Sequence, residues 1–165
     1  MAAIFCVQYN RTGNSDDIQL AIQHAQRAVD ITPTDHPNLG DMLNNLGNMI
    51  SYRYDRTKDL DDLQLAIQYI QRASNIALPN HPDLPARLNT LAAMLFDRYD
   101  QTGNLDDQQQ AVQHVQRAVD VTLHNHPYLA ARLNNLKKRR YSQGFQGTRH
   151  AQEQNGSGPR NNVHT

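Results

Sequence analysis

The chain has 165 residues, with 16 lysines or arginines against 16 acidic residues, so its formal charge is zero. Residues 137–165 hold six basic residues and one acidic residue, whereas residues 1–136 hold ten basic residues and 15 aspartates. A mildly acidic body with a basic tail argues against a dedicated nucleic-acid-binding protein. Cys6 is the only cysteine, which excludes an internal disulfide and a thiolate zinc site.

The first residues, MAAIFCV, are apolar but too few for a signal-peptide core, and no stretch reaches the length of a membrane span. A lone cysteine also suits a reducing compartment. We therefore expect a soluble, cytoplasmic protein without a membrane partner.

One sequence motif occurs three times along the chain, with small differences. DHPNLGDMLNNLGNMI begins at Asp35, NHPDLPARLNTLAAML at Asn80 and NHPYLAARLNNL at Asn125. The copies lie 45 residues apart, and the Asp-Asp pairs that begin at Asp16, Asp61 and Asp106 keep the same interval. A fixed period in the range of about 20–50 residues indicates an array of stacked repeats.

Each unit predicts two helices, A and B. Helix A is expected to start at the His-Pro pair, because proline suits a first helical turn and keeps the preceding residue out of the helical conformation. The segments DRTKD and DQTGN should end it. Apolar residues recur in helix A at helical spacing: Leu39, Leu43, Leu46, Ile50 and Tyr54, then Leu84, Leu88, Leu91, Leu95 and Tyr99.

Helix B should begin at Asp59 or Asn104, which are natural N-caps followed by two acids that suit the positive end of the helix dipole. It should end before ALPNHP, because proline cannot continue a helix. Its expected buried stripe is Leu63, Ala66, Ile67, Ile70 and Ala73. Small residues would allow close helix packing at Gly47, Ala66, Ala73, Ala92, Ala111 and Ala118.

The array is incomplete at both ends. Only the second half of a helix A precedes the first helix B, and the third helix A runs into Lys137 and Arg140 where apolar or small residues should stand. We expect a repeat array over residues 1–136 and a disordered Gly/Gln/Asn-rich tail over 137–165. Apolar residues near positions 4–5 and 133–136 would allow end-to-end self-association.

The spacing Leu43-x2-Leu46-Gly47-x2-Ile50, followed by Ala66-x3-Ile70 and Ala73, resembles the tetratricopeptide repeat (TPR) pattern W-x2-L-G-x2-Y, A-x3-F and A. The period exceeds the usual value of about 34 residues. The sequence of the repeat unit is most similar to long TPR arrays of fungal proteins and to kinesin-light-chain repeats. The resemblance implies an all-α fold, a short right-handed α-solenoid of antiparallel helix pairs.

In TPR proteins the inner faces of the A helices line a concave groove. The resemblance places on that face Asn44, Asn48, Asn89, Asn134 and Lys138. Side-chain amides can pair with the backbone of an extended peptide, and Lys138 can meet a carboxylate. Alternatively, the asparagines recur because units were duplicated and the face is solvated. The array departs from the carboxylate-clamp pattern at Ala93.

Other polar residues have structural explanations. Each of the repeated histidines precedes proline at a helix start, and His124-x-His126 lacks a third ligand nearby, so no metal site is predicted. Helix capping accounts for the Asp-Asp pairs better than paired catalytic carboxylates do. Cys6 is read as a packing residue. The run KKRR at 137–140 suggests an import signal or a contact for an acidic partner, but a solvated tail is favoured.

These patterns predict a non-catalytic module that binds a protein or peptide, with no cofactor and no small-molecule substrate. No phosphate-binding loop, nucleophile elbow or metal set is evident. The alternative is a truncated fragment of a larger TPR-containing signalling protein, without independent activity. Nucleic-acid binding through the basic tail is a third, weaker hypothesis.

Overall fold

The computed structural model describes residues 15–122 and residue 134. Within these residues the chain forms α-helices joined by short connections, without a strand. The helices are α2 (Ser15–Ile31), α3 (Leu39–Thr57), α4 (Leu60–Ile76), α5 (Leu84–Thr102) and α6 (Leu105–Asp120). Helices α3 and α5 are the predicted A helices, and α2, α4 and α6 are the predicted B helices. The prediction of an all-α fold of stacked helix pairs is confirmed.

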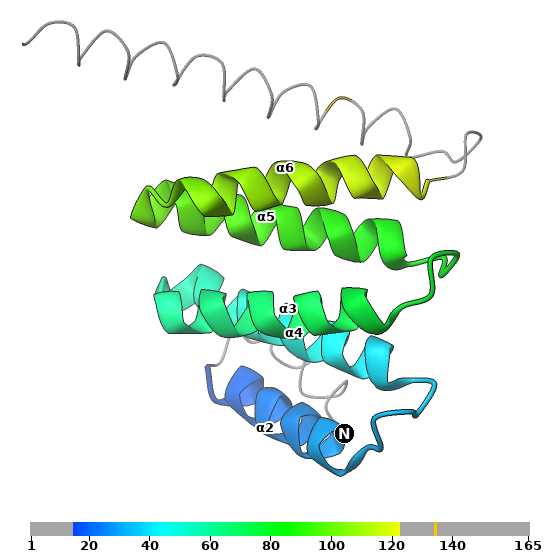
Figure 1. Ribbon diagram of the computed structural model, residues 1–165. Helices are drawn as coiled ribbons and strands as arrows, with labels where there is room; N and C mark the ends of the chain where they lie inside the picture. The colour runs from blue at the N-terminus through cyan, green and yellow to red at the C-terminus, as the bar shows by residue number, and fades with distance from the viewer. Residues whose placement is uncertain (1–14, 123–133, 135–165) are drawn as a thin grey trace, which may run out of the picture.

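The helices stack in chain order, with α2 at one end and α6 at the other (Figure 1). Helices α3 and α4 pack together as one hairpin and α5 and α6 as the next. Contacts of α2 with α3 and of α4 with α5 join successive units. One cluster of buried apolar side chains extends from α2 to α6, so the units share a core. A single unit could not bury its apolar face alone.

The predicted apolar stripes form this core. On α3 and α4 every predicted stripe residue is buried, and on α5 only Tyr99 remains partly exposed. The small residues at Gly47, Ala66, Ala73, Ala92, Ala111 and Ala118 are buried as well. The helical spacing of apolar residues was therefore sufficient to identify the faces that meet.

The A helices end where the sequence predicts. Lys58 and Gly103 follow them with left-handed backbone conformations, φ 56° and 71° respectively. Their backbone N–H groups donate to the carbonyl oxygens of Tyr54 and Tyr99 at 2.7 Å, which closes each helix.

The B helices begin at the predicted caps. The side chain of Asp59 accepts a hydrogen bond from the backbone N–H of Asp61 at 3.0 Å. Asn104 accepts one from Asp106 in the same way. Each cap satisfies a backbone donor that has no partner within the helix.

The predicted start of helix A was wrong by a few residues. Helices α3 and α5 begin at Leu39 and Leu84, beyond the His-Pro pair. A turn intervenes, in which the carbonyl oxygen of His36 accepts the N–H of Leu39, and the His36 Nδ1 accepts the N–H of Asn38 at 3.1 Å. His81 forms the corresponding turn. The histidine therefore caps a turn that precedes the helix.

The second aspartate of the Asp61-Asp62 and Asp106-Asp107 pairs has a role that capping does not explain. Asp62 and Asp107 are buried and form two-pronged ion pairs with Arg53 and Arg98, with Nε–Oδ2 distances of 2.8 Å in both. The attribution of both aspartates to the helix dipole was therefore incomplete, because the arginine partner comes from the preceding A helix.

Each of these arginines also reaches the neighbouring unit. Arg53 donates to the side-chain oxygen of Gln19 on α2, and Arg98 donates to that of Gln64 on α4. The three partners recur at the 45-residue period. The repeated clamp thus ties the two helices of a unit to each other and to the B helix before them.

Several predictions fall outside the described residues. These concern both ends of the array, Cys6, the His124-x-His126 pair, the basic run 137–140, Lys138, the tail and its boundary at 136, and the self-association surfaces. In the part of the chain that the structure describes, none of the helices combines the length and apolar character needed to cross a membrane.

Candidate functional site

A polar cleft of about 410 Å³ lies between the consecutive A helices α3 and α5. We call it the α3–α5 cleft. Polar groups dominate its walls, which a buried core contact between two helices would not show. Its lining residues are Asp41, Asn44, Asn45 and Asn48 from α3, with Asp83, Ala86, Arg87 and Thr90 from the start of α5.

Two of the predicted groove residues meet in this cleft. Asn44 and Asn48 lie one helical turn apart, both half-buried, and their side-chain amides have no hydrogen-bond partner among the described residues. Asn89 is half-buried on α5 but does not line the cleft. Asn134 is exposed. Lys138 lies outside the described residues.

Arg87 is one of the cleft residues that sequence reasoning missed. It is only 4% exposed, yet it carries a charge that is costly to bury without partners. Its guanidinium donates to Asp41 on α3 and, at 3.4 Å, to the carbonyl oxygen of Ala73 in the last turn of α4. Its Nε has no partner among the described residues. Arg87 therefore joins three helices, and one of its donors is left unsatisfied.

The backbone of α3 is shaped to accept Arg87. A Cβ at Gly40 would lie 3.0 Å from the Arg87 Nη1, closer than ordinary van der Waals contact. Glycine at position 40 thus leaves room for the guanidinium beside Asp41. Gly40 and Arg87 are far apart in sequence, so no local pattern could link them.

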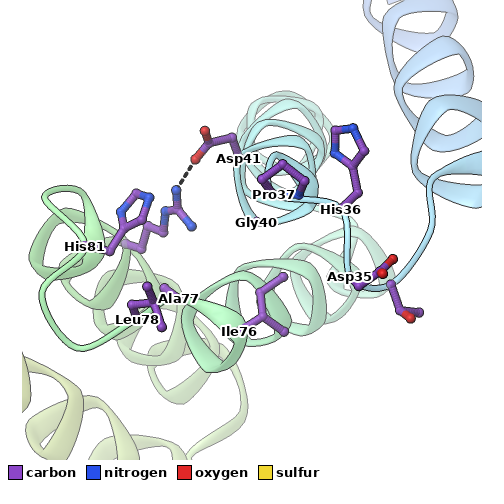
Figure 2. A pocket seen from close by; sticks show the side chains of 11 residues that line it. Asp35, His36, Pro37, Gly40, Asp41, Ile76, Ala77, Leu78 and His81 are labelled. Atoms are coloured by element: carbon purple, nitrogen blue, oxygen red, sulfur yellow. Dashed lines mark hydrogen bonds and ion pairs between the residues drawn. The ribbon is translucent and has the colours of Figure 1, made fainter.

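A second cleft, of about 360 Å³, is also lined by this ion pair (Figure 2). The two turns that contain His36 and His81 frame it, and Asp41 and Arg87 line it as they line the α3–α5 cleft. Its lining is more apolar than that of the α3–α5 cleft and includes the exposed side chains of Ile76 and Leu78. The Asp41–Arg87 pair therefore lines both a polar cleft and a more apolar one.

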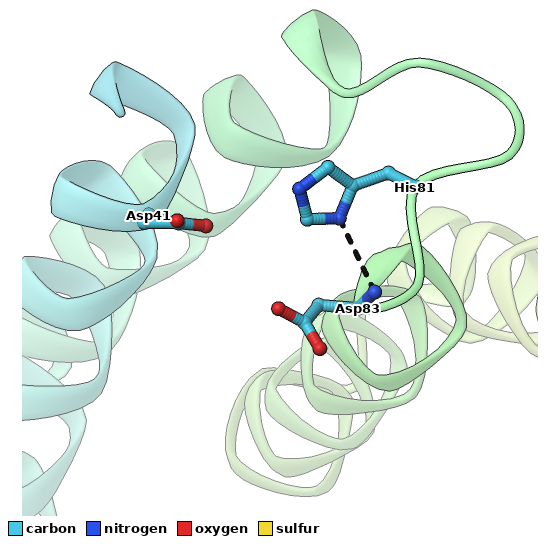
Figure 3. A group of neighbouring side chains, drawn as sticks. All are labelled: Asp41, His81 and Asp83. Atoms are coloured by element: carbon cyan, nitrogen blue, oxygen red, sulfur yellow. Dashed lines mark hydrogen bonds between the residues drawn. The ribbon is translucent and has the colours of Figure 1, made fainter. Parts of the chain in front are cut away.

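Asp41, His81 and Asp83 form a cluster at the edge of both clefts, with side-chain nitrogen and oxygen atoms within 4.8 Å of one another (Figure 3). Such a set can be considered as a metal site. However, His81 Nδ1 accepts the backbone N–H of Asp83 at 3.2 Å, so the neutral ring carries its proton on Nε2 and that nitrogen cannot act as a ligand. The donor set therefore fits a metal ion poorly.

The helical units correspond to a known family model. The tetratricopeptide repeat model matches residues 39–83 and 86–128. The first match spans α3 and α4, and the second covers α5 from its third residue onward and all of α6. The chain belongs to the tetratricopeptide repeat family. TPR proteins generally act as non-catalytic modules for protein–protein interaction. No curated protein sequence matches this TPR chain significantly.

Proposed function

We propose that this TPR array is a non-catalytic interaction module that holds an extended peptide or protein segment in the α3–α5 cleft. The observation that carries the proposal is the pair of half-buried amides of Asn44 and Asn48, which have no partner among the described residues. Each amide offers two donors and one acceptor, the groups that a peptide backbone requires. A polar cleft between helices can therefore bind an extended peptide through hydrogen bonds to its main chain.

The remaining predicted residues would continue this row along the array. Asn89 and Asn134 follow Asn44 at intervals of 45 residues. We propose that a longer bound segment passes from Asn44 and Asn48 towards these two asparagines and that Lys138 meets a carboxylate of the ligand. Contacts from several repeats would then add to one another, since Asn44 and Asn89 lie on the A helices of successive units.

The test is a selection of random dodecapeptides, displayed on phage, against the immobilised full chain. Selected peptides are synthesised with a fluorescent label and their affinity is measured by anisotropy. We expect the variant Asn44→Ala/Asn48→Ala to bind at least about tenfold more weakly, because several hydrogen bonds to the peptide are lost. The control Gln68→Ala/Gln113→Ala removes two exposed amides from the B helices and should bind like the wild type.

All variants are compared by circular dichroism and thermal melting. The proposal is wrong if no peptide is selected by the folded chain. It is also wrong if the asparagine variant binds as tightly as the wild type.

A further inference from the structure

We propose that the segment bound by this cleft carries a basic side chain, arginine in preference to lysine, and that Asp41 and Asp83 hold it at the N-terminal ends of α3 and α5. The inference rests on the proposed function, because it assigns a ligand group to one end of the same cleft. Both aspartates line the α3–α5 cleft, beyond Asn44 and Asn48.

The two aspartates are not part of the repeated framework. One period after Asp41 stands Ala86, and one period after Asp83 stands Tyr128, whereas Asn38 precedes Asp83 by the same interval. The caps and arginine clamps of the array recur from unit to unit. Duplication therefore does not explain why two acids face each other at this junction.

The carboxylate of Asp83 forms no hydrogen bond or ion pair among the described residues. Asp83 occupies the N-cap position of α5, where aspartate normally accepts a backbone hydrogen bond, but its side chain makes none. The imidazole of His81 already accepts the N–H of Asp83. The dipole of α5 favours an acid at this position. It does not require that the acid face Asp41 across the junction.

The charges at this end of the cleft are incompletely balanced. Arg87 pairs with Asp41, which leaves Asp83 as a second negative group within 4.8 Å of it. Two neighbouring carboxylates repel each other, and a cation between them would remove that repulsion. Residues 15–122 also contain 15 aspartates against eight lysines or arginines, an excess that attracts basic partners.

A guanidinium suits this arrangement better than a metal ion does. Its planar fork can donate to two carboxylates at once. Nε2 of His81 is a donor, as argued above, and Ca²⁺ would need more oxygen ligands than two aspartates supply.

The test uses the full chain, its variant Asp83→Asn and the control Asp100→Asn. Asparagine is also a good N-cap residue, so Asp83→Asn should fold normally. Asp100 is an exposed acid near the other end of the same helix. Random dodecapeptides are selected against each chain, and the best wild-type binder is synthesised with arginine and with citrulline, its neutral isostere, at the enriched position.

We expect wild-type and Asp100→Asn binders to share a basic residue at one position, arginine more often than lysine. Replacement of that arginine by citrulline should weaken binding to the wild type by about tenfold, and should have much less effect on Asp83→Asn. Equal effects of citrulline on both chains, or binders without a shared basic residue, would overturn this inference. The proposed function would still stand if Asn44→Ala/Asn48→Ala weakened those binders.

A metal control separates the remaining alternative. Zn²⁺ and Ca²⁺ are added singly to the wild type and to Asp83→Asn, and thermal melting is recorded with and without EDTA. We expect neither ion to raise the melting temperature through Asp83. A rise that is confined to the wild type and reversed by EDTA would identify a metal site and overturn the inference.

Discussion

Gly47 of α3 lies so close to Ile70 of α4 that a Cβ at position 47 would come within 2.8 Å of both Cγ1 and Cδ1 of Ile70. The same Cβ would be 3.2 Å from the carbonyl oxygen of Ala66, a backbone atom that cannot rotate away. One period later the equivalent residues are Ala92 and Val115, both buried. The larger residue on the A helix thus coincides with the smaller one on the B helix, and the packed volume is conserved.

This relationship predicts that Gly47→Ala destabilises the array even though alanine is the better helix former. Overpacking of a core costs about 1–3 kcal/mol, and the helical preference for alanine returns about 0.5–1 kcal/mol. We expect a net loss of about 1 kcal/mol in urea unfolding followed by circular dichroism. The second change Ile70→Val should recover most of it, because Val115 stands opposite Ala92. If the double variant instead lost the sum of what the two single variants lose, the two positions would not share this space.

The buried ion pairs predict a larger effect. In Arg98→Met the carboxylate of Asp107, which is 2% exposed, loses its cationic partner. We expect the free energy of unfolding to fall by about 3–5 kcal/mol. The double variant Arg98→Met/Asp107→Leu should regain much of this, since no buried charge remains. Arg72→Met, at an exposed site on α4, is the control and should change little. A single variant as stable as that control would contradict the assignment.

His114 predicts a specific dependence of stability on pH. Burial on α6 lowers the pKa of His114 below its usual value, and the charge of Arg117 lowers it further. As the pH falls through about 6.5, the unfolded chain takes up this proton before the folded chain does. Protonation therefore favours unfolding, and stability rises with pH up to that point.

The measurement compares the wild type with His114→Gln across about pH 5–8. All other histidines are common to the two chains, so their contributions cancel. As the pH falls below about 6.5, the free energy of unfolding of the wild type should decrease relative to that of His114→Gln. A difference that is constant with pH would mean that His114 titrates alike in both states.

The residues that follow α3 and α5 predict opposite effects on stability for two exchanged substitutions. Lys58 and Gly103 both have positive φ, but only glycine adopts that conformation without a steric cost. We expect Gly103→Lys to lower the thermal stability, by about 1 kcal/mol. Lys58→Gly should be neutral or mildly stabilising, because the Lys58–Asp55 ion pair is exposed and long at 3.9 Å. If both changes destabilised the chain equally, backbone strain would not be the cause.

Much of the fold could be predicted because its signals are local. The spacing of Leu39, Leu43, Leu46 and Ile50 specifies a helical face directly, and Asp59 caps a backbone donor only two residues away. The 45-residue period then indicates that equivalent faces stack. The start of helix A was misplaced because His36 supports either a helix cap or a preceding turn, and proline is compatible with both.

The candidate site depended on tertiary structure. Arg87 pairs with Asp41 across 46 positions, and Asp83 comes to face Asp41 only because α5 packs where it does. The resemblance to the TPR pattern placed Asn44 and Asn48 on a groove face, and both line the cleft, but the opposite wall with Thr90 was not predicted. By itself the sequence determined the helices, their buried faces and the repeat family, whose causes lie within a few residues or one period. Only the stacking of α5 on α3 and α4 decided which charges meet, because that depends on distances between helices that no spacing along the chain encodes.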